Sequence, residues 1–200
     1  AANDLLSKFS TPPIPLQTSP SERDRRATTR EPLADPGTAH VSTAPLAGMP
    51  FSVAVKDRMM YSHTFVFGDG VPFTTGCTSV VTATFEGATL GKFDVLIDIL
   101  VAQKLLREVM ELYDHKNLDT LPEFARPDGS RCNTTVEVMA RAVHGQLHAR
   151  LREFHAQSAA DGEGKGLGGI TAMHIKLDES DVASASYWET DAAGLFPSKM

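Results

Sequence analysis

The sequence predicts an α+β fold, in which a four-stranded antiparallel sheet carries two helices packed on one face. Three observations predict it. Alternating or β-branched segments lie at both ends of the region 49–190, two apolar stripes at helical spacing lie between them, and turns containing Gly separate the segments. Sequential strands at both ends can pair into one sheet, and the two helices then cover one of its faces.

The first predicted strands cover residues 51–65 and 79–86, which alternate in polarity or are rich in β-branched side chains. Residues 66–78 are predicted to form a loop, because they contain several residues that interrupt regular structure. These are Gly68, Gly70, Pro72 and Gly76. After a Gly-containing turn, residues 92–97 are expected to return as an antiparallel strand.

Two helices are predicted next. Asp98 can cap the first, because its carboxylate can accept hydrogen bonds from the first turn, and Thr134-Thr135-Val136-Glu137 is a capping box for the second. Apolar residues recur on one face of each helix. They are Ile99, Ala102, Leu106, Val109, Met110 and Tyr113, and then Val136, Met139, Ala140, Val143, Leu147, Leu151 and Phe154. Residues 156–169 are predicted to be a flexible linker, followed by strands at 170–177 and 184–188.

Composition excludes several classes of function. The net charge of -6 argues against a broad phosphate-binding surface. No apolar stretch reaches the roughly 18 residues of a membrane span, and no secretory signal pattern is present. Cys77 and Cys132 lack the spacing of a disulfide framework, so free thiols in a reducing, intracellular compartment are expected.

Residues 1–48 differ from the rest, because seven prolines interrupt a stretch rich in Ser, Thr, Arg and Asp. Such a segment cannot bury enough apolar area to offset the entropy of ordering it. We therefore expect it to be extended and to lie along another polypeptide. The predicted organisation is an N-terminal extension (1–48), a globular domain (49–190) and a C-terminal tail (191–200).

Three motifs stand out in the globular domain. They are Asp114-His115-Lys116-Asn117-Leu118-Asp119, Thr134-Thr135-Val136-Glu137 and Lys176-Leu177-Asp178-Glu179-Ser180-Asp181. Together they resemble the 6-pyruvoyl-tetrahydropterin synthase and 6-carboxy-tetrahydropterin synthase family. The resemblance implies the tetrahydropterin-synthase T-fold, in which trimers close a barrel and two trimers stack into a hexamer.

The same resemblance implies roles for five residues. Asp114 and His115 correspond to the family's catalytic pair, which moves a proton. Thr135 and Glu137 match its Thr-x-Glu motif, and Glu179 corresponds to the carboxylate that anchors the pterin. Each residue also has a purely structural interpretation: Asp114 and His115 as the end of a helix, Glu137 as a capping partner, and Glu179 as an exposed hairpin acid.

The zinc site of this family is only partly present. His63 matches the first zinc histidine by resemblance, but Thr75 and Cys77 stand where two further histidines belong. A catalytic zinc site needs three protein donors and one open position. His63 and Cys77 supply two donors, and the family's catalytic cysteine has no counterpart among residues 69–71. We therefore expect a degenerate, empty metal site, and His63 also has the interpretation of an ordinary strand histidine.

Two classes of function follow. The first is a non-catalytic structural subunit of a larger assembly, without a cofactor, whose residues 1–48 contact other protein subunits. Local RNA contact could then involve Arg23–Arg30 or Arg141–Arg152, and a ribonucleoprotein or mitochondrial setting is compatible with this hypothesis. The alternative is a divergent lyase that acts on a dihydropterin triphosphate, holds zinc through His63 and Cys77, and forms a homo-oligomer with its site between neighbours.

Overall fold

The computed structural model describes residues 48, 50–68, 70–160, 167 and 169–190. The predicted tail at 191–200, and all of the predicted extension except Gly48, therefore lie outside the described residues. The elements in chain order are β1 (Phe51–Phe65), β2 (Phe73–Gly87), α1 (Ile99–Met110), β3 (Lys116–Asn117), the 3-10 turns η1 (Leu118–Thr120) and η2 (Pro122–Phe124), α2 (Val136–Ala160), β4 (Ile170–Asp178) and β5 (Ser184–Thr190). Among the described residues, no helix has the length and hydropathy of a membrane span.

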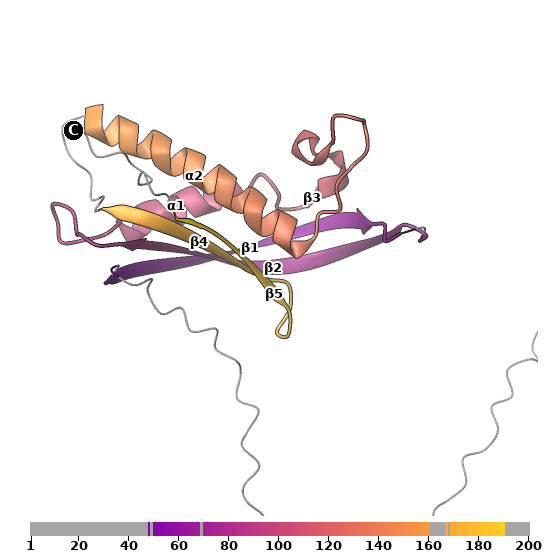
Figure 1. The fold of residues 1–200 in the computed structure, drawn as a ribbon, viewed down its shortest axis with the longest axis horizontal. Coiled ribbons are helices and arrows are strands. Elements are labelled where there is room, and N and C mark those ends of the chain that lie inside the picture. The colour runs from indigo at the N-terminus through magenta and orange to yellow at the C-terminus, as the bar shows by residue number, and fades with distance from the viewer. Residues whose placement is uncertain (1–47, 49, 69, 161–166, 168, 191–200) are drawn as a thin grey trace, which may run out of the picture. The chain divides into compact units, whose positions relative to one another are not determined.

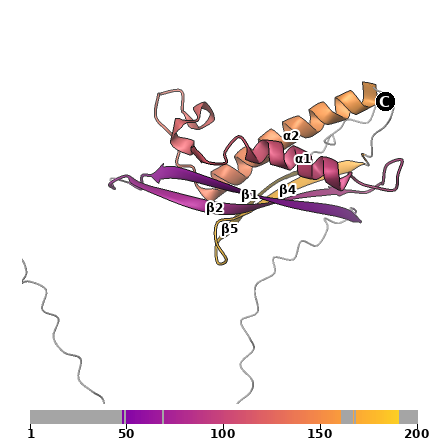
Figure 2. The same ribbon diagram turned by 180° about the vertical axis from the view of Figure 1, so that it is seen from behind.

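The strands form one sheet in the order β3-β1-β2-β4-β5, and both helices cover the same face of it (Figures 1 and 2). This confirms the predicted α+β layer. The predicted strand count was wrong by one, because the chain leaving α1 adds the two-residue strand β3 in parallel beside Tyr61 and Ser62. All other neighbouring strands are antiparallel.

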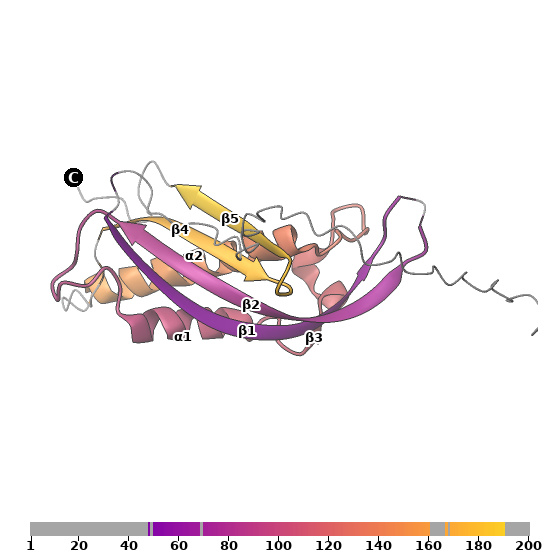
Figure 3. The ribbon, with the colours of Figure 1, turned by 90° about the horizontal axis from the view of Figure 1, so that it is seen from below.

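Two strand predictions were wrong. Strand β2 begins at Phe73 rather than after a loop at 66–78, because β-branched threonines there continue the pairing with β1. Residues 92–97 form a turn instead of a strand: the Gly91 N–H donates to the Val95 carbonyl at 2.8 Å. The long β1–β2 hairpin that results extends beyond the end of β4 (Figure 3).

The two helices largely follow their predicted stripes. Asp98 caps α1 as expected, since its carboxylate accepts a hydrogen bond from the Leu100 N–H at 2.8 Å. Helix α2 continues to Ala160, so the predicted linker at 156–169 begins too early; alanine and glutamine at its start favour a helix. The rest of that predicted linker, apart from residues 167 and 169, lies outside the described residues.

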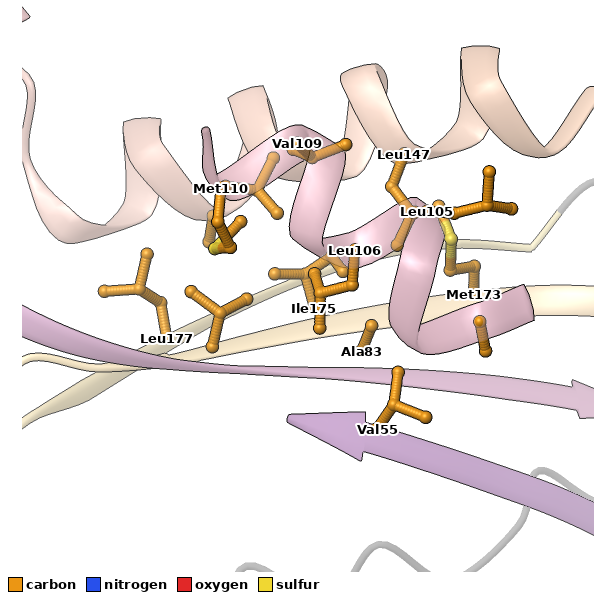
Figure 4. Packing of buried hydrophobic residues seen from close by; sticks show 14 of the residues in the cluster. Val55, Ala83, Leu105, Leu106, Val109, Met110, Leu147, Met173, Ile175 and Leu177 are labelled. Atoms are coloured by element: carbon orange, nitrogen blue, oxygen red, sulfur yellow. The ribbon is translucent and has the colours of Figure 1, made fainter. Parts of the chain in front are cut away.

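The core lies between the helices and one face of the sheet (Figure 4). Ala83 of β2 and Ile175 of β4 point up from the sheet toward Leu106 of α1, and Leu147 of α2 packs from above. Each of these four side chains is fully buried. The helices therefore exclude water from most of this face of the sheet.

The loop after α1 covers part of the free edge of β1. Asp114 accepts a hydrogen bond from the Met60 N–H at 2.8 Å, and the His115 N–H donates to the Met60 carbonyl at 2.6 Å. Further along the same edge, Asp119 accepts from Thr64 N–H at 3.1 Å and the Asn133 amide bonds both backbone groups of Val66 at 3.1 and 2.8 Å. These contacts fix the backbone of β1 around His63.

Stability is expected to fall in mild acid because of His144, which lies buried between α2 and the sheet. Its Nε2 bonds to the Met173 carbonyl at 3.2 Å. Burial lowers the pKa of His144 below its ordinary value of 6.5, and burial also lowers the pKa of His174. The unfolded chain therefore takes up protons first as the pH falls through about 6.5, which favours unfolding.

Urea unfolding at a series of pH values between 7.5 and 5 would measure this effect. We expect the free energy of unfolding to decrease across that interval, and the decrease to be smaller in His144→Gln. A His155→Gln variant, on the same helix, provides a control. If the free energy of unfolding fell equally with pH in the wild type and in His144→Gln, His144 would not be the cause of the pH dependence.

Candidate metal centre

The register of β1 and β2 places two pairs of polar side chains on the helix-covered face. Tyr61 lies opposite Cys77, and His63 lies opposite Thr75. Directly opposed residues of antiparallel strands point to the same face, and side chains alternate along a strand. Cys77 therefore shares its face with the buried Val81. The site thus continues the row of core-facing side chains of β1 and β2 toward the end of the hairpin that these two strands form.

Glu179 reaches the same place from β4. It follows Asp178, which pairs with Val80, and it continues the alternation of the buried Ile175 and Leu177. Its N–H donates to the Ala183 carbonyl at 3.0 Å, which closes the β4–β5 turn. Glu179 therefore points to the core side of the sheet and is not an outward-facing hairpin acid.

Three ligating side chains converge here. The ligand atoms of His63, Cys77 and Glu179 all lie within 4.8 Å of one another. His63 is buried, whereas Cys77 and Glu179 are half-buried. In the described part of the chain, no other three His, Cys, Asp or Glu side chains form such a group. The structure thus adds a third donor to the two expected from the sequence.

The hydrogen bonds of His63 define its tautomer. Its Nδ1 lies 3.0 Å from the carbonyl oxygen of Thr134 and 3.0 Å from the hydroxyl of the same residue. A carbonyl can only accept, so Nδ1 carries the proton and Nε2 presents a lone pair. Nε2 is buried and has no hydrogen-bond partner among the described residues. Leaving such an acceptor unpaired costs about 1–3 kcal/mol, which a metal ion would offset.

The Thr134 hydroxyl is therefore used differently from the prediction, which made it the cap of the second helix. Thr135 takes that position: its hydroxyl accepts from the Val138 N–H at 3.4 Å. Glu137 is exposed, and its pKa is lowered by its own backbone N–H and by the Thr135 hydroxyl. The predicted pterin-binding residues Thr135 and Glu137 thus form the start of α2, which Figure 1 shows resting on the sheet near β5.

A buried hydroxyl pair lies beside the thiol. The Ser79 hydroxyl oxygen is 3.5 Å from the Cys77 sulfur and 3.2 Å from the Tyr61 hydroxyl oxygen. Burial raises the pKa of Tyr61 well above its ordinary range, and the nearby Cys77 and Glu179 raise it further. Tyr61 therefore stays a neutral phenol at physiological pH. Sequence reasoning did not identify Tyr61 or Ser79 as part of the site.

Asp114 and His115 do not join this cluster within one chain. They bond to the backbone of Met60, whose side chain is on the opposite face of β1 from Tyr61 and His63. His115 is exposed and adopts a positive φ of 57°, a conformation that is uncommon for residues other than Gly. The pair lies beside a cavity of about 590 Å³ that Asp114 helps to line.

A five-stranded sheet covered on one face by two helices defines the class as a T-fold-like α+β protein. The family model for 6-pyruvoyl tetrahydropterin synthase matches residues 74–190. The chain therefore belongs to the 6-pyruvoyl tetrahydropterin synthase family, as its motifs indicate. Comparison with curated protein sequences finds no match.

Solved structures agree with this fold. The 6-pyruvoyl tetrahydropterin synthase of Plasmodium falciparum is 14% identical, with a TM-score of 0.51, and covers 70% of this chain and 98% of its own. The Plasmodium vivax enzyme has the same identity and coverage and a TM-score of 0.53. A catalytic residue mutant of the Plasmodium vivax enzyme also matches, at 13% identity, a TM-score of 0.51 and the same coverage. At these identities the likeness establishes the fold alone.

The residues present fit a zinc ion of the kind this family's motifs imply. Imidazole nitrogen, thiolate sulfur and carboxylate oxygen are the three donor types that zinc takes from proteins, and three of them leave one position open. Nε2 of His63 is buried and has no hydrogen-bond partner among the described residues, so its lone pair is free to ligate. Its Nδ1 proton bonds to the Thr134 carbonyl, and ligating histidines usually donate their other ring N–H in this way.

Proposed function

We propose that this protein is a metal-dependent enzyme of the 6-pyruvoyl tetrahydropterin synthase type, which acts on a reduced pterin and holds a divalent ion through His63, Cys77 and Glu179. The observation that supports it best is the unpaired, buried Nε2 of His63 beside a thiol and a carboxylate. Most buried polar atoms have a hydrogen-bond partner. Among the described residues, Nε2 of His174 is also buried without one, but His174 belongs to no group of three possible ligands, so the nearby thiol and carboxylate distinguish His63.

The chain's own residues would divide the work as follows. The Thr134 carbonyl holds the His63 ring in the ligating tautomer. A zinc ion with one open position would polarise an oxygen of the substrate as a Lewis acid. Asp114 and His115 would transfer the proton. Because these two bond to the free edge of β1 at Met60 and are not part of the cluster, a neighbouring copy would have to supply them, and the proposal therefore includes a homo-oligomer.

The test combines metal content with turnover. Elemental analysis of the purified protein should find zinc in a ratio close to one per chain. The zinc-loaded protein should release triphosphate from a dihydropterin triphosphate, and a chelator should stop the release. A protein that neither contains nor takes up zinc would refute the proposal. Zinc binding without release would remove the lyase activity and leave only a metal-binding protein.

A second candidate is a non-catalytic structural subunit of a larger, mitochondrial or ribonucleoprotein, assembly. Two observations favour it. Thr75 stands where the resemblance places a zinc histidine, and Asp114 already serves to bind the edge of β1. A tagged copy should then recover other proteins in fixed ratio and contain no zinc. Recovery of a zinc-containing homo-oligomer alone would exclude this candidate.

A further inference from the structure

Building on the proposed metal site, we infer that Tyr61 and Ser79 are positioning residues for the Cys77 sulfur. Their hydroxyls form a chain that ends on the thiolate and directs it toward His63 and Glu179. Tyr61 and Ser79 would support a ligand rather than bind the metal, and the family motifs assign them no role.

The geometry of this hydrogen-bond chain is set by the β1–β2 pairing. Tyr61 is directly opposite Cys77, and Ser79 is two residues further along β2, so all three point to the same face. The Tyr61 oxygen lies 3.2 Å from the Ser79 oxygen, which lies 3.5 Å from the Cys77 sulfur. Ser79 is fully buried and Tyr61 is 5% exposed. The chain is therefore shielded from water, which would otherwise compete for these bonds.

The two hydrogen bonds can run in one direction, from Tyr61 through Ser79 to Cys77. Either hydroxyl of the Tyr61–Ser79 pair could be the donor, and donation from Tyr61 to Ser79 Oγ leaves the Ser79 hydrogen free for the sulfur. The Ser79 hydroxyl can then direct its own hydrogen at Cys77. A metal-bound sulfur is a thiolate, which accepts hydrogen bonds and has none to donate. Hydrogen bonds that run from the Tyr61 hydroxyl to the Ser79 hydroxyl, and from there to the Cys77 sulfur, therefore suit Cys77 as a thiolate ligand.

A packing role for Tyr61 can be separated from this one. Its ring meets the His63 ring edge-on, with 5.2 Å between centroids. Phenylalanine keeps that ring contact and removes only the hydroxyl. Tyr61→Phe therefore tests the hydrogen-bond chain, and Ser79→Ala interrupts the same chain at its second link.

The experiment measures zinc affinity by competition with a chromophoric chelator in folded wild-type, Tyr61→Phe and Ser79→Ala protein. Loss of a residue that supports a metal ligand typically weakens metal binding roughly 10–100-fold, and we expect about 10-fold for each variant, with little more for the double variant. The thiolate-to-metal charge-transfer band of the cobalt-substituted protein should shift in both. Tyr113→Phe is the matched control, because Tyr113 is also fully buried and is not one of the residues of the cluster or of its hydrogen-bond chain.

Three results are decisive. Weaker zinc binding and a shifted band in both variants, with Tyr113→Phe unchanged, support the inference. Wild-type affinity and an unchanged band in Tyr61→Phe and Ser79→Ala would overturn it while leaving the metal site intact. Absence of zinc binding by the wild-type protein would instead refute the proposed function, so the two failures have different signatures.

Discussion

Replacing His63 with alanine is expected to weaken zinc binding by more than about 100-fold, since losing a residue that only supports a ligand already costs roughly 10–100-fold. The variant removes the ligand itself. His63 contributes the buried nitrogen of the cluster, and the other two donors, Cys77 and Glu179, cannot hold a zinc ion with one position open. Zinc content after dialysis against a weak chelator would measure the loss.

Unfolding provides an independent measure of the same site. A ligand present at about 100 times its dissociation constant adds roughly 2.7 kcal/mol to the free energy of unfolding. We expect zinc to stabilise the wild type by an amount of this order and to leave His63→Ala unchanged. His174→Ala is the control, because in the described part of the chain His174 also has a buried Nε2 without a partner but is not part of the cluster. Equal stabilisation of wild type and His63→Ala by zinc would contradict the assignment.

Phe85→Ala should cause the largest loss of stability among simple core substitutions. Phe85 lies on the core face of β2 and is fully buried. Phe→Ala changes at such positions cost about 3–5 kcal/mol, because apolar contacts are lost and a cavity remains. The change should reduce the midpoint of urea unfolding. The protein that remains folded at low temperature should keep its zinc affinity.

Phe73→Ala is the matched control for that substitution. Phe73 is in the same strand, but its side chain is 53% exposed, so we expect less than about 1 kcal/mol of destabilisation. Similar losses in the two variants would mean that the described packing of β2 is wrong.

Local signals were sufficient for much of the fold. Spacing and side-chain chemistry predict the apolar stripes of α1 and α2, the Asp98 cap and the strands at the two ends of the domain sequence. Two of the failed strand predictions depend on pairing with β1. Residues 73–78 become strand because β1 pairs with them, and residues 116–117 become β3 because they meet its free edge. Neither partner is visible in a short window of sequence.

The sequence by itself determined the family, the α+β layer and the identity of His63 and Cys77 as candidate ligands. The third donor was decided by tertiary structure. The alternation of Met173, Ile175 and Leu177 indicates that Glu179 faces inward, but only strand register brings it within 4.8 Å of the other two donors. Register between β2 and β4 joins residues about a hundred positions apart, and it is set by the packing of the whole sheet against its helices rather than by neighbours in the chain.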